Sequence, residues 1–404
     1  MSVQQAFLGI PREEFSARVE RLRAHLEAEG LAGAVLFDPA YVLYYTGFAF
    51  IPTERPIAFA LSATGRTALF VPRLEREHAE SSAHVERVEH YDEYPGETHP
   101  MHQLVKLLES LGISGRVGVK VGADEDGYPW VLGYRGPRLG EVLNAQVKNV
   151  RPFVEAQMAV KSEREIALLK ESAKWANLAH RLLQRYTRVG ASETEVSARA
   201  SLEATRAMLD ALGSLYQAKS PWASGARAGY RGQIGRKSAI PHAMAGDLTF
   251  RPGDVLVTGA TAPIWGYHAE LERTLIVGEP TPRQRELFEH MLALQRTAFE
   301  ALKPGARCAD VDRAVRSYYE KHGLMGYWRH HVGHAIGLRY HEGPFLDVGD
   351  ETAIEPGMVF TVEPGLYDPE IGGFRHSDTV VVTDDGIEIL THYPRDLESL
   401  IIPA

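Results

Sequence analysis

The N-terminal third of the chain combines one amphipathic helix with several short β-rich runs. Between residues 11 and 30, the apolar residues Phe15, Val19, Leu22 and Leu26 recur at helical spacing, and Gly30 provides a stop signal. Strands are expected at 33–37, 57–61, 67–71 and near 117–119, with a second helix near 104–111. Strands that alternate with helices predict a small α/β domain.

The pattern changes near residue 155, and we place the two domains at residues 1–155 and 156–404. From Ser162 a long run of apolar positions keeps a helical period, and Ser192 with Glu195 predicts a capping box at the start of the next helix. Further helices are expected at 283–302 and 309–322, and strands at 254–258, 268–276, 358–362 and 379–383. The whole chain therefore predicts a two-domain α/β (α+β) protein.

The composition is that of a globular protein with a large core. The chain has 404 residues, of which 44% are hydrophobic and 24% charged, which suits two domains. Its net charge of −9 provides no overall positive field that would hold nucleic acid. The single cysteine, Cys308, excludes an intrachain disulfide and is typical of a reducing compartment. Because no leader-like or long apolar segment is present, we expect a cytoplasmic protein with no membrane partner.

Four segments of the second half concentrate histidine and glutamate in apolar, strand-like surroundings. Side chains in a strand alternate between faces, so Glu270 and Glu272 point the same way and His268 joins them. If that face is buried, each unpaired carboxylate costs several kcal/mol and requires a metal ion, a proton, a cationic substrate or an arginine such as Arg273 or Arg375. If the strand lies at a sheet edge, the same charges lie in water.

Five motifs follow one another in these segments. They are Gly-Tyr-x-x-Glu-x-x-Arg-Thr at 266–274, Val-Gly-His-Ala-Ile-Gly-Leu at 332–338 with His341-Glu342, Glu-Pro-Gly-Met at 355–358, Val-Glu-Pro-Gly-Leu-Tyr at 362–367, and Gly-Gly-Phe-Arg at 372–375. Together they resemble the pita-bread hydrolases, which include prolidase, aminopeptidase P, methionine aminopeptidase and creatinase. The resemblance implies a catalytic domain in which a curved antiparallel sheet, backed by helices, holds the active site.

Typical members of this group bind two metal ions through two aspartates, one histidine and two glutamates, and this chain keeps part of that set. His334 and Glu363 match the histidine and the first glutamate, and Glu270 stands at the second aspartate as a longer carboxylate. The first aspartate would lie at Gly259, and Ser377 replaces the last glutamate. The resemblance therefore implies one divalent metal, expected to be zinc, bound by Glu270, His334 and Glu363.

Creatinase, the member of the group that works without metal, offers the competing interpretation. Its general acid/base histidine matches His242, and the glutamates that hold its guanidinium substrate match Glu272 and Glu363. Creatinase has no carboxylate at the position of Glu270, however, and the run 339–346 is similar to prolidase. A peptidase is therefore the preferred prediction. A metal-free amidinohydrolase is the alternative, and a peptide-binding protein without activity is the third hypothesis.

The resemblance also assigns the catalytic residues. His242 corresponds to a histidine that touches the reacting carbonyl, and His341 to one that hydrogen-bonds the scissile peptide group. Glu363 would combine metal ligation with general acid/base work. Glu272 completes the candidate catalytic set, as a glutamate that both faces the site and matches creatinase.

Three residues are assigned to substrate binding. His330 matches a position next to the substrate's proline in aminopeptidase P, and Arg375 stands in the last motif. Arg55 lies in a loop that resembles the creatinase loop whose arginine meets the substrate carboxylate. As in prolidase and creatinase, that loop would reach the neighbouring cleft of a homodimer. His331 and His376 match no family role, and a structural or surface role is expected for each.

The preferred function is hydrolysis of a peptide bond beside proline by water bound to one zinc ion. In the two-metal aminopeptidases, the substrate's amine contacts the metal bound by the first aspartate, which is absent here. The resemblance therefore favours dipeptidase or carboxypeptidase action on a small peptide over aminopeptidase action. The amidinohydrolase alternative would need no metal.

Overall fold

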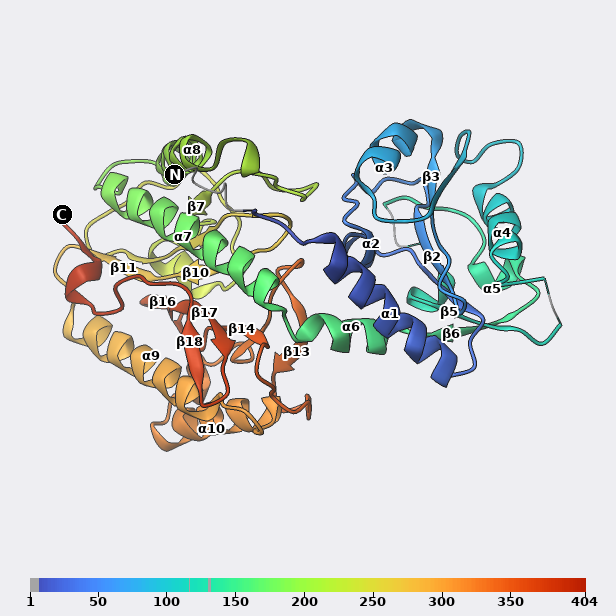
Figure 1. The fold of residues 1–404 in the computed structure, drawn as a ribbon. Helices are drawn as coiled ribbons and strands as arrows, with labels where there is room; N and C mark the ends of the chain where they lie inside the picture. The colour runs from blue at the N-terminus through green and yellow to red at the C-terminus, as the bar shows by residue number, and fades with distance from the viewer. Residues whose placement is uncertain (1–6, 116, 130–131) are drawn as a thin grey trace, which may run out of the picture. The chain divides into compact units, whose positions relative to one another are not determined.

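The computed structural model describes residues 7–115, 117–129 and 132–404, which form two compact units (Figure 1). The N-terminal unit comprises Ile10–Met158 together with Lys219–Pro221. The C-terminal unit comprises Ala159–Ala218 and Trp222–Ala404, with residues 7–9. The chain passes from one unit to the other between Met158 and Ala159, at the end of helix α6 (Arg151–Ala159).

The N-terminal unit is built on a six-stranded sheet with the strand order β4-β3-β2-β1-β5-β6. Strands β1, β2 and β3 pair antiparallel, whereas β4, β5 and β6 are added in parallel. The strands are β1 (Gly33–Leu36), β2 (Ala58–Ser62), β3 (Thr67–Pro72), β4 (Arg87–Tyr91), β5 (Lys120–Ala123) and β6 (Gln146–Asn149). The helices are α1 (Arg12–Ala28), α2 (Pro39–Thr46), α3 (Arg76–Ser82), α4 (Pro100–Ser110) and α5 (Leu139–Val142).

The first helix confirms the amphipathic pattern. Phe15, Leu22 and Leu26 are buried on one face of α1, and Gly30 adopts φ 64° just beyond its end, a conformation that glycine accepts at little cost. The strand expected near 117–119 begins instead at Lys120. Gly118 has φ 79° and belongs to a turn, so the chain becomes extended only after it.

The C-terminal unit contains four long helices. They are α7 (Glu163–Tyr186), α8 (Glu193–Leu212), α9 (Pro282–Ala301) and α10 (Cys308–Lys321). In Figure 1 the strands of this unit lie between the α7/α8 pair and the α9/α10 pair. Helix α7 begins with a capping box between Ser162 and Glu165. The box expected at Ser192 does not form, because its hydroxyl donates to Asp247 Oδ1 at 2.8 Å instead.

The sheets of the C-terminal unit bring distant segments together. An eight-stranded sheet, antiparallel at each of its pairings, has the order β13-β12-β14-β17-β10-β9-β7, and β18 pairs with β17. Its strands are β7 (Arg227–Gly229), β9 (Gly259–Thr261), β10 (Leu271–Glu272), β12 (Gly333–Ala335), β13 (Glu342–Leu346), β14 (Val359–Val362), β17 (Ser377–Val382) and β18 (Ile387–Ile389). The remaining strands are β8 (Val255–Val257), β11 (Thr274–Val277) and β19 (Ile401–Ile402), which form a three-stranded sheet, and the hairpin β15 (Gly365–Asp368) and β16 (Gly372–Arg375).

The single strand expected over 268–276 is wrong, because the chain changes sheets at Arg273. Leu271 and Glu272 pair with β17, whereas Thr274–Val277 pairs with β8. Between them, the backbone N–H of Arg273 donates to Thr258 Oγ1 and its carbonyl accepts the backbone N–H of Thr258. The fully buried guanidinium binds Asp378 and four backbone carbonyls, so Arg273 fixes the junction between the two sheets.

Candidate active site

One pocket of about 500 Å³ in the C-terminal unit collects most of the predicted site residues. It is lined by Arg231, Ile240, Pro241, His242, Glu270, Glu272, Arg329, His330, His331, His341, Glu363 and Arg375. Glu270 and Glu272 therefore share one surface, as the strand alternation predicts. His268 is not part of this lining; its ring packs 4.9 Å from that of Tyr340. Arg55 lies in the N-terminal unit, where it forms ion pairs with Glu54 and Glu93.

Three of these side chains could share one cation. Ligand atoms of Glu270, His334 and Glu363 all lie within 4.8 Å of one another. His334 Nδ1 contacts the carbonyl of Ala335 at 3.0 Å, which favours the proton on Nδ1 and turns the Nε2 lone pair toward Glu363 Oε1, 3.2 Å away. Beyond this contact with Glu363, Nε2 has no polar partner among the described residues. Two carboxylates and an oriented imidazole are a donor set that fits one divalent metal.

Without a cation, this cluster has to hold protons. Burial, followed by the charges of Glu363 and Glu272, raises the pKa of Glu270 to about 8. Burial alone would lower the pKa of His334, but its contact with Glu363 outweighs burial and raises that pKa to about 9. Burial alone would raise the pKa of Glu363. The contact with His334 and the charge of Arg375 outweigh burial and hold that pKa well below its usual range. A neutral Glu270 and a His334–Glu363 ion pair are the result near pH 7.

Metal binding should therefore strengthen as the pH rises from about 6 to 9. The metal needs deprotonated ligands, and the elevated pKa values of Glu270 and His334 mean that it competes with a proton at each. Each displaced proton changes the apparent affinity by up to roughly tenfold per pH unit below its pKa. Calorimetric titration with Zn²⁺ at several pH values measures the apparent affinity. Repeating it in buffers of different ionisation enthalpy gives the number of protons that the metal displaces. An affinity independent of pH would contradict this protonation scheme.

The two positions where family ligands are missing have other partners. The hydroxyl of Ser377 donates to Glu270 Oε1 at 2.7 Å, so it supports a ligand and adds no negative charge. Gly259 lies next to Thr258, whose hydroxyl is buried between His180 and the carbonyl of Arg273. Neither position supplies a carboxylate. The described residues therefore offer ligands for one metal ion here.

Glu272 is bound by two arginines. Its Oε1 accepts from Arg231 Nη2 at 2.7 Å, and its Oε2 forms an ion pair with Arg375 Nε. Arg375 Nη1 donates to the hydroxyl of Tyr367, which contacts His330 Nε2 at 2.7 Å. The predicted arginine Arg375 thus compensates a buried carboxylate, whereas Arg273 points away from the pocket to Asp378. Because both oxygens of Glu272 are engaged, it is poorly placed to hold the guanidinium group of a substrate.

The histidines occupy different parts of the site. The rings of His334 and His341 stack with centroids 3.9 Å apart. Burial, followed by the charge of His334, lowers the pKa of His341 to about 4, so its imidazole is neutral near pH 7. His242 lines the pocket with an exposed side chain, and His331 lines it between His330 and His334. His376 lies outside the lining, fully buried, and contacts the backbone of Thr274 and Arg395, a structural environment.

Two pocket residues, Arg231 and Arg329, were missed by the sequence analysis. Arg231 lies in the turn after β7 with φ 53°, and its only sequence signal is the Arg-Gly pair at 231–232. Arg329 directly precedes His330 and donates to the carbonyls of Gly326, Trp328 and Tyr367. Neither residue stands in a family motif.

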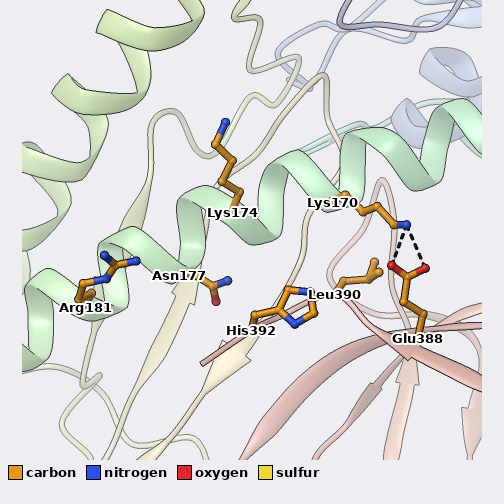
Figure 2. Close-up of a pocket in the computed structure, with 7 residues that line it drawn as sticks. All are labelled: Lys170, Lys174, Asn177, Arg181, Glu388, Leu390 and His392. Atoms are coloured by element: carbon orange, nitrogen blue, oxygen red, sulfur yellow. Dashed lines mark hydrogen bonds and ion pairs between the residues drawn. The ribbon is translucent and has the colours of Figure 1, made fainter. Parts of the chain in front are cut away.

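A second pocket, of about 330 Å³, lies over α7 and the segment that begins with β18 (Figure 2). Its lining consists of Lys170, Lys174, Asn177, Arg181, Glu388, Leu390 and His392. The carboxylate here belongs to Glu388 and forms an ion pair with Lys170. Lys174 pairs with Glu171 on the same helix. None of the candidate catalytic or metal-binding residues lines this pocket, so the chemistry is assigned to the first one.

Comparison with known proteins agrees with this geometry. Residues 167–384 match metallopeptidase family M24, and residues 18–166 match the creatinase/prolidase N-terminal domain. The chain belongs to metallopeptidase family M24. The match confirms the resemblance to the pita-bread hydrolases and the mixed α/β fold, and it places the chain among hydrolases of the metallopeptidase class.

Several relatives are similar over most of their length. A putative dipeptidase of Bacillus subtilis is 29% identical over 94% of this chain and 99% of its own. An Xaa-Pro dipeptidase of Pyrococcus horikoshii is 31% identical over 83% of this chain and 86% of its own. The solved structure of an Xaa-Pro dipeptidase from Bacillus anthracis has a TM-score of 0.79 and 27% identity, and covers 96% of this chain and 99% of that one. Among the described residues, we find no helix with the length and apolarity needed to cross a membrane.

Proposed function

We propose that this chain hydrolyses short peptides at the bond beside proline, as a dipeptidase or carboxypeptidase that uses one divalent metal, expected to be zinc. The observation that carries the proposal is the cluster of Glu270, His334 and Glu363, whose ligand atoms lie within 4.8 Å of one another beside the pocket. Relatives named Xaa-Pro dipeptidase or putative dipeptidase match between 83% and 96% of the chain and support the choice of substrate.

The chain's own residues account for the proposed chemistry. A bound divalent metal would lower the pKa of a coordinated water and polarise a carbonyl. Glu363, kept ionised by His334 and Arg375, is suited to accept a proton from the attacking water. The neutral His341 imidazole can hydrogen-bond the scissile peptide group, and His242 at the exposed side of the pocket can approach the same group. Arg375 forms an ion pair with the buried Glu272 and holds its side chain in place.

The function is tested with glycyl-L-proline and two blocked proline peptides. Purified protein supplemented with Zn²⁺, Mn²⁺ or Co²⁺ should hydrolyse glycyl-L-proline. An N-acetylated peptide should remain a substrate, because the family's first aspartate is absent, whereas a C-amidated one should not. Rejection of the acetylated peptide with acceptance of the amide would overturn the assignment of the substrate terminus. Hydrolysis of creatine by protein without metal would favour the amidinohydrolase alternative instead.

Replacement of His242 by alanine should reduce turnover by roughly a hundredfold or more. Loss of an acid/base group or of a donor to the developing oxyanion commonly has an effect of this size. His242 is exposed and makes no hydrogen bond among the described residues, so the substitution should leave stability unchanged. Steady-state kinetics with glycyl-L-proline, next to thermal unfolding, measures both. A rate close to that of the wild type would exclude His242 from the reaction.

We further propose a homodimer in which Arg55 reaches the catalytic pocket of the neighbouring subunit. The resemblance of its loop to that of creatinase motivates the proposal. Arg55 now forms ion pairs with Glu54 and Glu93, which it would have to exchange for a substrate carboxylate. Light scattering at working concentration should give twice the monomer mass, and Arg55→Met should weaken substrate binding. A monomeric mass with full activity would contradict this assembly.

A further inference from the structure

Arg231 is held in the pocket by an unfavourable backbone conformation. Its φ of 53° lies in the left-handed region, which a long side chain rarely adopts, and Gly232 follows with φ 78°. A Cβ at Gly232 would lie 2.1 Å from the carbonyl oxygen of Met244, so the turn depends on glycine there. Unfavourable conformations that persist in a pocket are commonly associated with function.

The guanidinium of Arg231 lies where a side chain at position 259 would extend. Gly229 in β7 pairs directly with Gly259 in β9, which brings the turn that holds Arg231 beside that strand. A Cβ built on Gly259 would lie 3.5 Å from Glu272 Oε1, 3.8 Å from Arg231 Nε and 3.9 Å from its Cζ. Where the family resemblance places an acidic ligand, this chain therefore has a fixed positive charge.

Part of this guanidinium is available to a ligand. Nη2 donates to Glu272 Oε1 at 2.7 Å and to Gln233 Oε1 at 3.2 Å. Nε and Nη1 donate no hydrogen bond among the described residues, and the side chain is 49% exposed. One edge of the planar group is thus held by the protein, and its other donors can reach the pocket. Because Nε and Nη1 point to opposite sides of the guanidinium, each of them can donate one charge-assisted hydrogen bond to a carboxylate.

The arginines of the pocket differ in how far they are neutralised by carboxylates. Arg231 and Arg375 share the carboxylate of Glu272, and Arg375 Nε also lies 3.8 Å from Glu363 Oε2. Arg329, in the same lining, donates to backbone carbonyls and adds a further positive charge. At its exposed donors, the guanidinium of Arg231 would attract a carboxylate and repel a protonated amine.

We propose that Arg231 is a specificity-determining residue that binds the carboxylate of the substrate through a charge-assisted hydrogen bond from its free Nε or Nη1 donor. The inference rests on the proposed function for the identity of the substrate, a short peptide with a free C-terminal carboxylate. It assigns to a residue of the pocket itself the recognition that Arg55 would otherwise supply from a neighbouring subunit.

The first test compares L-proline with L-prolinamide, which differ in the carboxylate and are not hydrolysed. Calorimetric titration of the metal-loaded full chain should show that L-proline binds more tightly than the amide. Arg231→Met should weaken L-proline binding by roughly ten- to a hundredfold and leave the amide unaffected, because a charge-assisted hydrogen-bonded pair is lost. Arg231→Lys should have an intermediate effect. Arg236→Met is the matched control, since Arg236 lies five residues away and its ion pair with Glu370 is exposed.

A second pair of variants leaves Arg231 in place. Gly259→Asp would put a carboxylate against the guanidinium and compete with the ligand, so L-proline binding should fall as in Arg231→Met. Gly259→Ala adds only a Cβ at ordinary contact distances and should bind L-proline like the wild type. Unchanged L-proline binding in both Arg231→Met and Gly259→Asp would overturn the inference, as would a loss confined to Arg55→Met or equal binding of acid and amide by the wild type.

These experiments distinguish a failure of the Arg231 carboxylate site from a failure of the proposed peptidase function. Binding of L-proline that depends on Arg231, in a protein that hydrolyses no proline peptide with any of the metals, would reject the peptidase and retain the carboxylate site. Hydrolysis of glycyl-L-proline with a KM independent of Arg231 would retain the peptidase and reject the carboxylate site.

Discussion

His334→Ala should yield a folded protein that neither retains metal nor hydrolyses glycyl-L-proline. The imidazole is the one nitrogen ligand of the proposed cluster, and its Nε2 already lies 3.2 Å from Glu363 Oε1. Without it, two carboxylates remain, and one of them, Glu270, has its pKa raised to about 8 and is largely protonated at neutral pH. A site with one anionic ligand holds a divalent ion weakly. Elemental analysis after dialysis, together with the hydrolysis assay, measures both losses.

The control for this variant is His392→Ala. His392 is an exposed histidine of the same unit that lines the second pocket, so its loss should change neither metal content nor rate. Thermal unfolding of both variants separates loss of the ligand from loss of the fold. Full metal occupancy in His334→Ala would place the metal elsewhere and remove the proposed site.

The longest helices could be predicted closely from the sequence. Helices α9 and α10 each begin and end one residue before the expected bounds, because their apolar period and their flanking Pro and Gly residues are local signals. The break of the strand 268–276 has no such signal. It is imposed by contacts of Arg273 with Ser377, Tyr393 and Pro394, more than 100 residues away in the chain.

For the site too, residues with a local sequence signal could be predicted, whereas contacts between distant residues could not. The resemblance to the family identified His330, His341, Glu363 and Arg375, and the structure gathers these residues into one pocket. Arg231 stands outside the motifs, and its relation to the site is a contact with Glu272 across 41 positions. A candidate role for Glu272 could be stated from its face of the strand. The two arginines that bind its oxygens could not be predicted, because strand alternation gives the direction of a side chain and does not identify its partners.

Arg273→Met should lower the free energy of unfolding by about 3–5 kcal/mol, the range observed when one partner of a buried ion pair is removed. The side chains of Arg273 and Asp378 are completely buried and joined at 2.8 Å. The guanidinium also donates to the carbonyls of Glu272, Ser377, Tyr393 and Pro394. Removing it leaves a buried carboxylate without its cation and four carbonyls without this donor, while methionine replaces only the apolar volume. Urea unfolding monitored by circular dichroism gives the difference.

Arg313→Met provides the comparison, because Arg313 forms ion pairs with Asp310 and Glu351 whose side chains are all about half exposed. Such pairs contribute at most about 1 kcal/mol. Arg273 also donates to the backbone carbonyls of Glu272 and Ser377, which pair with each other across β10 and β17. The side chains of Glu272 and Ser377 both face the candidate site. Arg273→Met should therefore also reduce the rate of hydrolysis at a temperature where it remains folded, whereas Arg313→Met should not. Equal stability losses in the two variants would show that the Arg273 junction does not hold the two sheets together.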